Sequence, residues 1–185
     1  PYRPDTGDFL VSFGQTGLDG ITGLVSTDYI GSSSGGVATG LAAASNVELL
    51  DFDILSIPGV SHNDVITAIF NLCELRRDCY ALIDPPIGLT PAEVVDWHNG
   101  LLGTIPNTPT ARLDTHFASP VYPWWTLDSP QLGRRVSMPM SAGAIGAFLF
   151  NDVQSGQWYA PAGFNRGTIP DVVRLDYNVT RTDRD

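Results

Sequence analysis

Short apolar runs alternate along the chain with segments whose apolar residues recur at helical spacing. The run 79–83 (CYALI) contains aromatic and β-branched side chains, which is typical of a strand covered on both faces. A second run, 52–57, ends at Pro58 and Gly59. Between the two runs, segment 62–77 carries an apolar stripe at helical spacing. The members of this stripe are Val65, Ile69, Leu72 and Cys73.

Strand 52–57, helix 62–77 and strand 79–83 follow one another closely enough to form a βαβ unit. Such a unit has parallel strands and a right-handed crossover. Ser61 is the candidate N-cap of the helix, and Arg76 in the last turn suits the negative end of the helix dipole. The sequence therefore favours the α/β class.

A second helix, predicted over 90–102, has a well-defined start. Thr90 is the expected N-cap, Pro91 suits the first helical position, and Glu93 completes a capping box. A proline pair, Pro85 and Pro86, ends the preceding strand because proline cannot donate to a sheet.

A third helix is predicted from Ser141, as N-cap, to about Val153. Gly143 and Gly146 lower its helix propensity and are expected to permit close packing. Its expected apolar face consists of Ala144, Ile145, Phe148 and Leu149.

The remaining segments carry weaker signals of secondary structure. The segment 117–127 should contain a strand at an edge or a bulge, because Pro120 and Pro123 interrupt it. Further expectations are a weak strand at 9–13, a flexible turn at 31–36, a short helix at 37–44, a turn at 128–133, a return strand at 134–138 and a strand within 172–177. Together these elements predict one α/β domain over 1–185, with a mixed, partly parallel sheet and helices on both faces.

Composition excludes some partners. The formal charge is −10, with ten arginines and no lysine, which argues against nucleic acid as a partner. Apolar runs are far shorter than the roughly 20 residues of a membrane helix, so no membrane partner is expected. Cys73 and Cys79 are interpreted as small buried residues, and not as a disulfide or a zinc site, which fits an intracellular origin. The chain begins without Met and ends in a polar tail, so we expect a fragment of a longer protein.

Candidate chemistry is sparse. A Ser-His-Asp triad could combine Ser141 with Asp53 or Asp84 and with one of the three histidines, but Ser141 lies in PMSAG and not in a G-x-S-x-G elbow. We therefore interpret Ser141 as a helix cap, and His62 and His98 as ordinary surface or hydrogen-bonded residues. The pair Asp51 and Asp53 lacks further metal ligands, as does the pair at 183 and 185 in the tail. The glycine-rich segment 31–36 lacks the lysine of a P-loop. No catalytic, cofactor or metal residue is assigned.

Four tryptophans, at 97, 124, 125 and 158, can fill the core, or one or two can lie at an interface. Arg134 and Arg135 can form a solvated hairpin tip or meet an acidic patch on a neighbouring copy. At a net charge of −10, copies of this chain would need such basic positions in order to pack.

Several phrases, taken in order over about 25–180, together resemble the tail sheath proteins of contractile phages and related injection machines. The most specific phrase is WYAPAGFNRG, similar to the family's W-x-A-P-A-G-x-x-R-G. The positions that carry the resemblance, as structural signature residues, are Pro58, Gly59, Asp84, Pro85, Pro86, Trp97, Tyr122, Pro123, Ser141, Gly146, Trp158, Ala160, Pro161, Ala162, Gly163, Arg166 and Gly167.

The resemblance implies a structural subunit and not an enzyme. Sheath subunits stack as hexameric rings around an inner tail tube, form a helical assembly between baseplate and tail terminator, and contract to drive the tube through the host envelope for genome ejection. The resemblance also implies that the protein is located in the virion tail, after assembly in the host cytoplasm. The matching domain of the family is called subtilisin-like for its fold alone.

Two departures from the family qualify the resemblance. Where the family often has S-G-H-V-A-G, this chain has SAGAIG from Ser141 to Gly146, without a histidine. The family's C-terminal domain has no match here, so we expect a fragment that does not polymerise alone. Two alternatives stay open: a subtilisin-like serine hydrolase, and the sheath of a non-viral contractile injection system.

Overall fold

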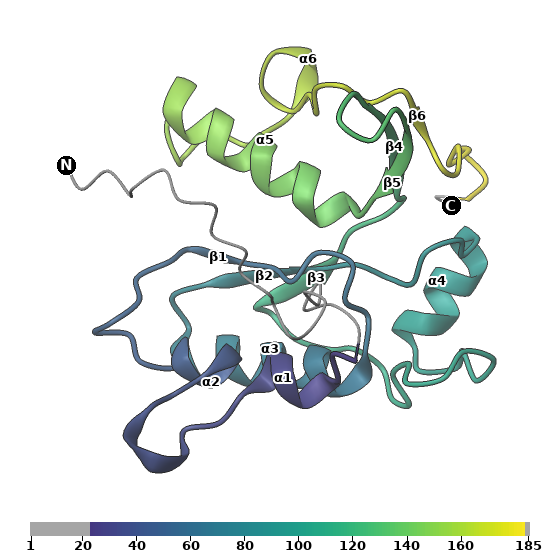
Figure 1. Cartoon of the computed structure of the whole chain (residues 1–185). Helices are drawn as coiled ribbons and strands as arrows, with labels where there is room; N and C mark the ends of the chain where they lie inside the picture. Colours follow the sequence, from purple (N-terminus) through teal and green to yellow (C-terminus); the bar gives the residue numbers. More distant parts are fainter. Residues whose placement is uncertain (1–22, 184–185) are drawn as a thin grey trace, which may run out of the picture.

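A computed structural model describes residues 23–183 of the 185-residue chain (Figure 1). A parallel sheet lies in the middle, α1, α2 and α3 lie on one side of it, and α5 lies on the other (Figure 1). A second, antiparallel sheet lies beside the N-terminal end of α5. The fold is therefore mixed α/β, with helices on both sides of the parallel sheet, as the sequence indicates.

The parallel sheet has the strand order β1-β2-β3. Leu55 of β1 pairs with Ala81 of β2, and Ala81 pairs with Ala118 of β3. The predicted βαβ unit is confirmed, although β1 is much shorter than the expected 52–57. The elements of this part are α1 (Ser26–Ile30), the 3-10 helix η1 (Ser34–Gly36), α2 (Gly40–Ala43), β1 (Ile54–Leu55), α3 (Asn63–Arg76), β2 (Tyr80–Ile83), α4 (Pro91–His98) and β3 (Ala118–Pro120).

The core lies between α3 and the parallel sheet. The predicted stripe on α3 is buried, and Trp97 of α4 joins the same cluster at 0% exposure. Ala81 and Ile83 of β2 pack there as well. Burial of these side chains is the main driving force for folding of this part of the chain.

Two expected helix boundaries are wrong. The N-cap of α3 is His62 and not Ser61, because His62 Nδ1 accepts the backbone N–H of Asp64 at 3.2 Å. The capping box of Thr90 and Glu93 is present, but α4 ends at His98 and not at 102. Gly100 then takes φ +73°, a left-handed conformation that ends helices.

Of two elements expected near the N-terminus, one is shorter than predicted and the other lies outside the described residues. Helix 37–44 reduces to α2, because Thr39 forms backbone and side-chain hydrogen bonds with Ser32 that hold the preceding residues in a loop. The weak strand expected at 9–13 lies outside the described residues, as does position 185 of the acidic tail pair.

Segment 117–127 divides between the two sheets. Pro120 ends the edge strand β3, as expected for a proline in a sheet, and the chain then crosses to the antiparallel sheet with the order β5-β4-β6. The hairpin predicted around 128–138 is confirmed. The strands of this sheet are β4 (Trp125–Ser129), β5 (Arg134–Met138) and β6 (Arg174–Leu175).

Two helices complete the described chain, α5 (Met140–Gln154) and the short α6 (Gly163–Arg166). The buried residues of α5 are Ser141, Gly143 and Asn151. Leu149, expected on the buried apolar face, is instead 58% exposed. Between residues 23 and 183, no helix combines the length and the apolar character that crossing a membrane requires.

Candidate functional site

The carboxylate of Asp84 joins three separate parts of the chain. Asp84 follows β2 directly and is 0% exposed. Its Oδ2 accepts the backbone N–H of Gly59 at 3.0 Å and the Oγ–H of Ser141 at 2.5 Å, and its Oδ1 accepts the backbone N–H of Ser141 at 2.9 Å. We call this arrangement the Asp84 junction.

Local sequence explains both sides of the junction. Gly59 follows Pro58 after β1 and takes φ +79°, which glycine adopts without strain and which fits its N–H contact with Asp84. At α5, the N-cap is Pro139, whose side chain cannot accept a hydrogen bond, so the first N–H groups of the helix need another acceptor. Asp84 supplies it, and its negative charge is favoured at the positive end of the helix dipole.

Ser141 is therefore not the N-cap that the sequence predicts. It is the second residue of α5, and both its backbone N–H and its hydroxyl donate to Asp84. The prediction was wrong because proline rarely serves as an N-cap. The side chain that accepts the N–H of the first turn instead belongs to Asp84, 57 positions before Ser141.

Tryptophan side chains reinforce the junction. Trp124 Nε1 donates to the carbonyl oxygen of Pro85 at 2.9 Å, and Trp125 Nε1 donates to that of Pro139 at 3.2 Å. Both indoles thus bond residues directly next to the junction. Trp97 and Trp125 are buried, which confirms core filling for these two, whereas Trp158 is 83% exposed.

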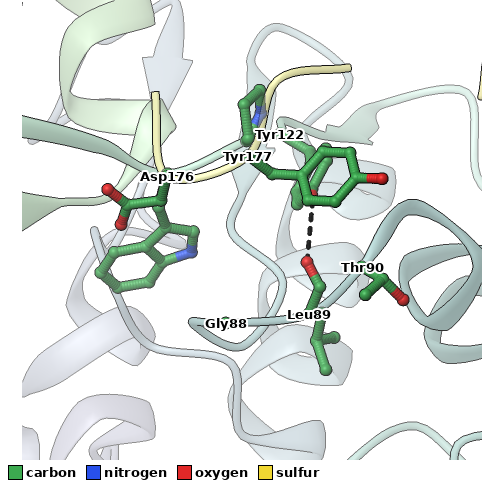
Figure 2. A pocket seen from close by; sticks show the side chains of 8 residues that line it. Gly88, Leu89, Thr90, Tyr122, Asp176 and Tyr177 are labelled. Carbon is green, nitrogen blue, oxygen red and sulfur yellow. Dashed lines mark hydrogen bonds between the residues drawn. The ribbon is translucent and has the colours of Figure 1, made fainter. Parts of the chain in front are cut away.

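A small cavity of about 60 Å³ is lined in part by Trp124, the side chain that bonds Pro85 next to the junction. Figure 2 shows the residues that line this cavity. Tyr122 lines the cavity and donates its hydroxyl to the carbonyl oxygen of Leu89 at 2.8 Å, and the centre of the Tyr177 ring lies 6.4 Å from that of Tyr122. The carboxylate of Asp176 points away from both tyrosines and accepts the hydroxyls of Thr126, at 2.5 Å, and Ser137. The hydroxyls of Tyr122 and Thr90 and the carboxylate of Asp176, which line the cavity, therefore each have a hydrogen-bond partner within the protein.

The junction does not have the geometry of a Ser-His-Asp triad. The Ser141 hydroxyl donates directly to Asp84, so the carboxylate occupies the place where a triad has the imidazole. Ser141 is 0% exposed, which leaves a substrate no access in this conformation. Asp53, the other candidate acid, is exposed before β1.

No hydrogen bond joins any of the three histidines to the Asp84 carboxylate or the Ser141 hydroxyl in the described part of the chain. His62 caps α3. His98 is the last residue of α4, and its Nδ1 is buried without a hydrogen-bond partner among the described residues. His116 is exposed in the loop before β3.

The described residues do not form a metal site. Between positions 23 and 183, no group of three or more His, Cys, Asp or Glu side chains could hold a metal ion. Cys73 and Cys79 are buried free thiols, as the sequence predicts. Their sulfur atoms lie 3.6 Å apart. Burial raises the pKa of both thiols, which disfavours the thiolate that would bind a metal.

A second set of signature residues forms the connection from α5 to α6. Asn151 Nδ2 donates to the carbonyl oxygen of Tyr159 at 2.6 Å, and the Arg166 guanidinium lies 4.9 Å from the centre of the Tyr159 ring. Gly167 packs so closely on Pro161 that a Cβ there would lie 2.7 Å from the Pro161 carbonyl oxygen. These contacts fix a compact loop.

The structure places most signature positions in two groups, one around the junction and one in the loop between α5 and α6. Two positions belong to neither group: Trp97 lies in the core, and Gly146 lies on the exposed face of α5. Sequence reasoning missed the roles of Asn151 and Asp176, which no local motif marks. The junction group is Pro58, Gly59, Asp84, Pro85, Pro86, Tyr122, Pro123 and Ser141, and the loop group is Trp158, Ala160, Pro161, Ala162, Gly163, Arg166 and Gly167.

Comparison with known proteins adds one finding. No family model matches the chain. The chain is similar to the tail sheath protein of Vibrio phage KVP40, with 28% identity over 133 residues. This alignment covers 64% of the chain and 19% of the phage protein, so the chain corresponds to about one fifth of that relative.

Proposed function

We propose that this chain is part of a structural subunit of a contractile phage tail sheath. The observation that carries the proposal is the similarity to the tail sheath protein of Vibrio phage KVP40. The Asp84 junction supports it, because a buried carboxylate that joins the two strand ends to α5 makes the domain rigid and leaves Ser141 without access to a substrate. Rigid units that move relative to one another are what a mechanical assembly requires.

The finer proposal follows the sheath family. The subunit stacks in hexameric rings around an inner tail tube, between a baseplate and a tail terminator, and contraction of the rings drives the tube through the host envelope for genome ejection. It is assembled in the host cytoplasm and belongs to the virion. The domain has the subtilisin-like sheath fold and is part of a longer sheath polypeptide, in which the two signature groups serve a structural purpose.

Electron microscopy of the longer polypeptide that contains this chain tests the proposal. Negatively stained samples should contain tubes with a regular helical repeat. Dispersed particles at high concentration would overturn it. For the chain by itself, we expect no long assemblies in light scattering, because the rest of the subunit would be missing. The genes that flank the parent gene would separate a phage from a non-viral injection system.

The contact between Ser141 and Asp84 is the observation on which a serine hydrolase would rest. A fluorophosphonate probe, which labels activated serines, separates the two functions. We expect no labelling of the native chain, and the Ser141→Ala variant serves as the control. Labelling of the native chain that disappears in this variant would favour the hydrolase.

A further inference from the structure

The outer face of α5 is apolar and carries no partner within the described residues. Gly146, Leu149, Phe150 and Val153 follow the spacing i, i+3, i+4 and i+7, which places them on one face of the helix. Leu149, Phe150 and Val153 are 58%, 50% and 84% exposed. A Cβ added at Gly146 would meet nothing within 4 Å, so this position is open as well.

Two aromatic side chains extend this exposure past the end of the helix. Trp158, in the loop that follows α5, is 83% exposed, and Phe164 of α6 is 99% exposed. The α5–α6 apolar surface is defined here as Leu149, Phe150, Val153, Trp158 and Phe164. Both helices lie on the side of the parallel sheet opposite α1, α2 and α3 (Figure 1).

The size of this surface matches an interface. Because a fully exposed aromatic side chain presents roughly 150–250 Å², these residues expose on the order of 700 Å² of apolar area. Monomeric proteins rarely expose apolar patches above about 300–600 Å². A standard interface buries about 800 Å² on each partner. The α5–α6 apolar surface therefore supplies most of the area that a stable contact needs.

The charge pattern favours a second copy as the partner. The whole chain has a formal charge of −10, so two copies repel one another over most of their surfaces. Asp152 is the only charged residue between Arg135 and Arg166, a segment that contains all of α5. Two copies that meet through this segment bury apolar area with little like-charge repulsion.

We propose that the α5–α6 apolar surface binds a second copy of this chain. Gly146 contributes by letting the backbone of the second copy approach α5 closely. The inference deepens the proposed function, on which it rests for the expectation that copies of the chain assemble. It assigns the contact between subunits to a specific face of the domain.

Sedimentation velocity over a range of protein concentrations, up to about 1 mM, tests the inference on the 185-residue chain. Val153→Asp places a charge on the surface, and Val37→Asp is a matched control at a loop position that is 70% exposed. Phe164→Ala is a second variant, whose removed side chain is 99% exposed and cannot disturb the core. Circular dichroism establishes that each variant is folded.

We expect the chain and Val37→Asp to associate with similar dissociation constants, and Val153→Asp and Phe164→Ala to weaken association at least about tenfold, as is usual for loss of a buried apolar anchor. A chain that stays monomeric at every concentration would overturn the inference. Equal effects of Val153→Asp and Val37→Asp would also overturn it.

The same pair of variants in the longer polypeptide separates this inference from the proposed function. If tubes form with Val37→Asp and not with Val153→Asp, both are supported. If tubes form equally with both variants, the sheath function stands and the assigned surface is wrong. If no tubes form without a substitution, the sheath function is overturned, and the sedimentation comparison still decides whether this surface binds a second copy.

Discussion

Asp84 caps the first turn of α5 through Ser141, a residue 57 positions further along the chain. One carboxylate oxygen accepts the backbone N–H of Ser141 at 2.9 Å, and the other accepts its hydroxyl at 2.5 Å. A hydrogen bond that satisfies a helix N-terminus usually comes from the residue just before the helix. Here it comes from the end of a parallel strand, so formation of β2 and docking of α5 depend on each other.

Asp84→Asn should destabilise the protein by about 2–4 kcal/mol. The amide keeps the size of the side chain but removes the charge, and its NH₂ group must face at least one donor from Gly59 or Ser141. Urea unfolding followed by circular dichroism measures the loss. Asp114→Asn, at an exposed position, is the matched control and should change stability by no more than about 0.5 kcal/mol. Similar midpoints for the two variants would contradict the proposed importance of the junction.

Local structure could be predicted where neighbouring residues determine it. The capping box at Thr90 and Glu93, the buried stripe of α3 and the βαβ unit depend on residues that are close in sequence or on a regular period. The boundaries that failed, at Ser61 and after His98, each depended on a competing group, His62 in one case and Gly100 in the other.

The junction itself could not be predicted, because its parts are distant in sequence. Asp84 and Ser141 were both candidates for a catalytic triad, and nothing local showed that they would bond each other without a histidine. The exposure of Leu149 was also missed, since an apolar stripe looks the same whether it faces a core or a partner.

Acid should remove the stabilising contribution of the α4 capping box. The Glu93 carboxylate accepts the backbone N–H and the hydroxyl of Thr90, each at 2.8 Å, and these bonds lower the pKa of Glu93 below its usual 4.5. A folded pKa below the unfolded one stabilises the protein above pH 4.5, and this contribution disappears as the pH falls through the folded pKa.

Glu93→Gln should therefore be less stable than the unsubstituted chain at neutral pH, and the difference should disappear at acid pH below the folded pKa. Urea unfolding at a series of pH values measures it. Glu48→Gln, in an exposed turn, removes the same charge and serves as the control. A difference that stays constant from neutral to acid pH would show that Glu93 acts through something other than its charge.

The two cysteines should be inert in the folded protein. Burial, with a smaller contribution from the hydrogen bond to Cys79, raises the pKa of Cys73 to about 12, and burial also raises the pKa of Cys79. Because the thiolate is the reactive form, Ellman's reagent at pH 8 should react with Cys73 about a thousandfold more slowly than with an ordinary thiol, and with Cys79 more slowly than with an ordinary thiol. Both should react at once in denaturant. A Val37→Cys variant, exposed at that position, provides the ordinary rate, and a native chain that reacts equally fast would contradict the burial of the pair.

The two glycines of α5 should respond oppositely to the same substitution. Alanine favours a helix interior by about 1 kcal/mol over glycine. At Gly146 the new Cβ has open space, so Gly146→Ala should stabilise the chain by about that amount. At Gly143 the new Cβ would lie 2.8 Å from Ile169 Cδ1 and 3.3 Å from Trp125 Nε1, whose indole is buried and hydrogen-bonded.

Overpacking of this kind costs about 1–3 kcal/mol, so Gly143→Ala should leave stability unchanged or lower it by up to about 2 kcal/mol. Urea unfolding of the two variants side by side measures the difference, and equal gains would show that Ile169 moves aside at no cost. Sedimentation of Gly146→Ala then gives a separate result. A variant that is more stable as a monomer and yet associates more weakly would show that the open space beside Gly146 is filled by the second copy, since the same methyl group would favour the helix and obstruct the contact.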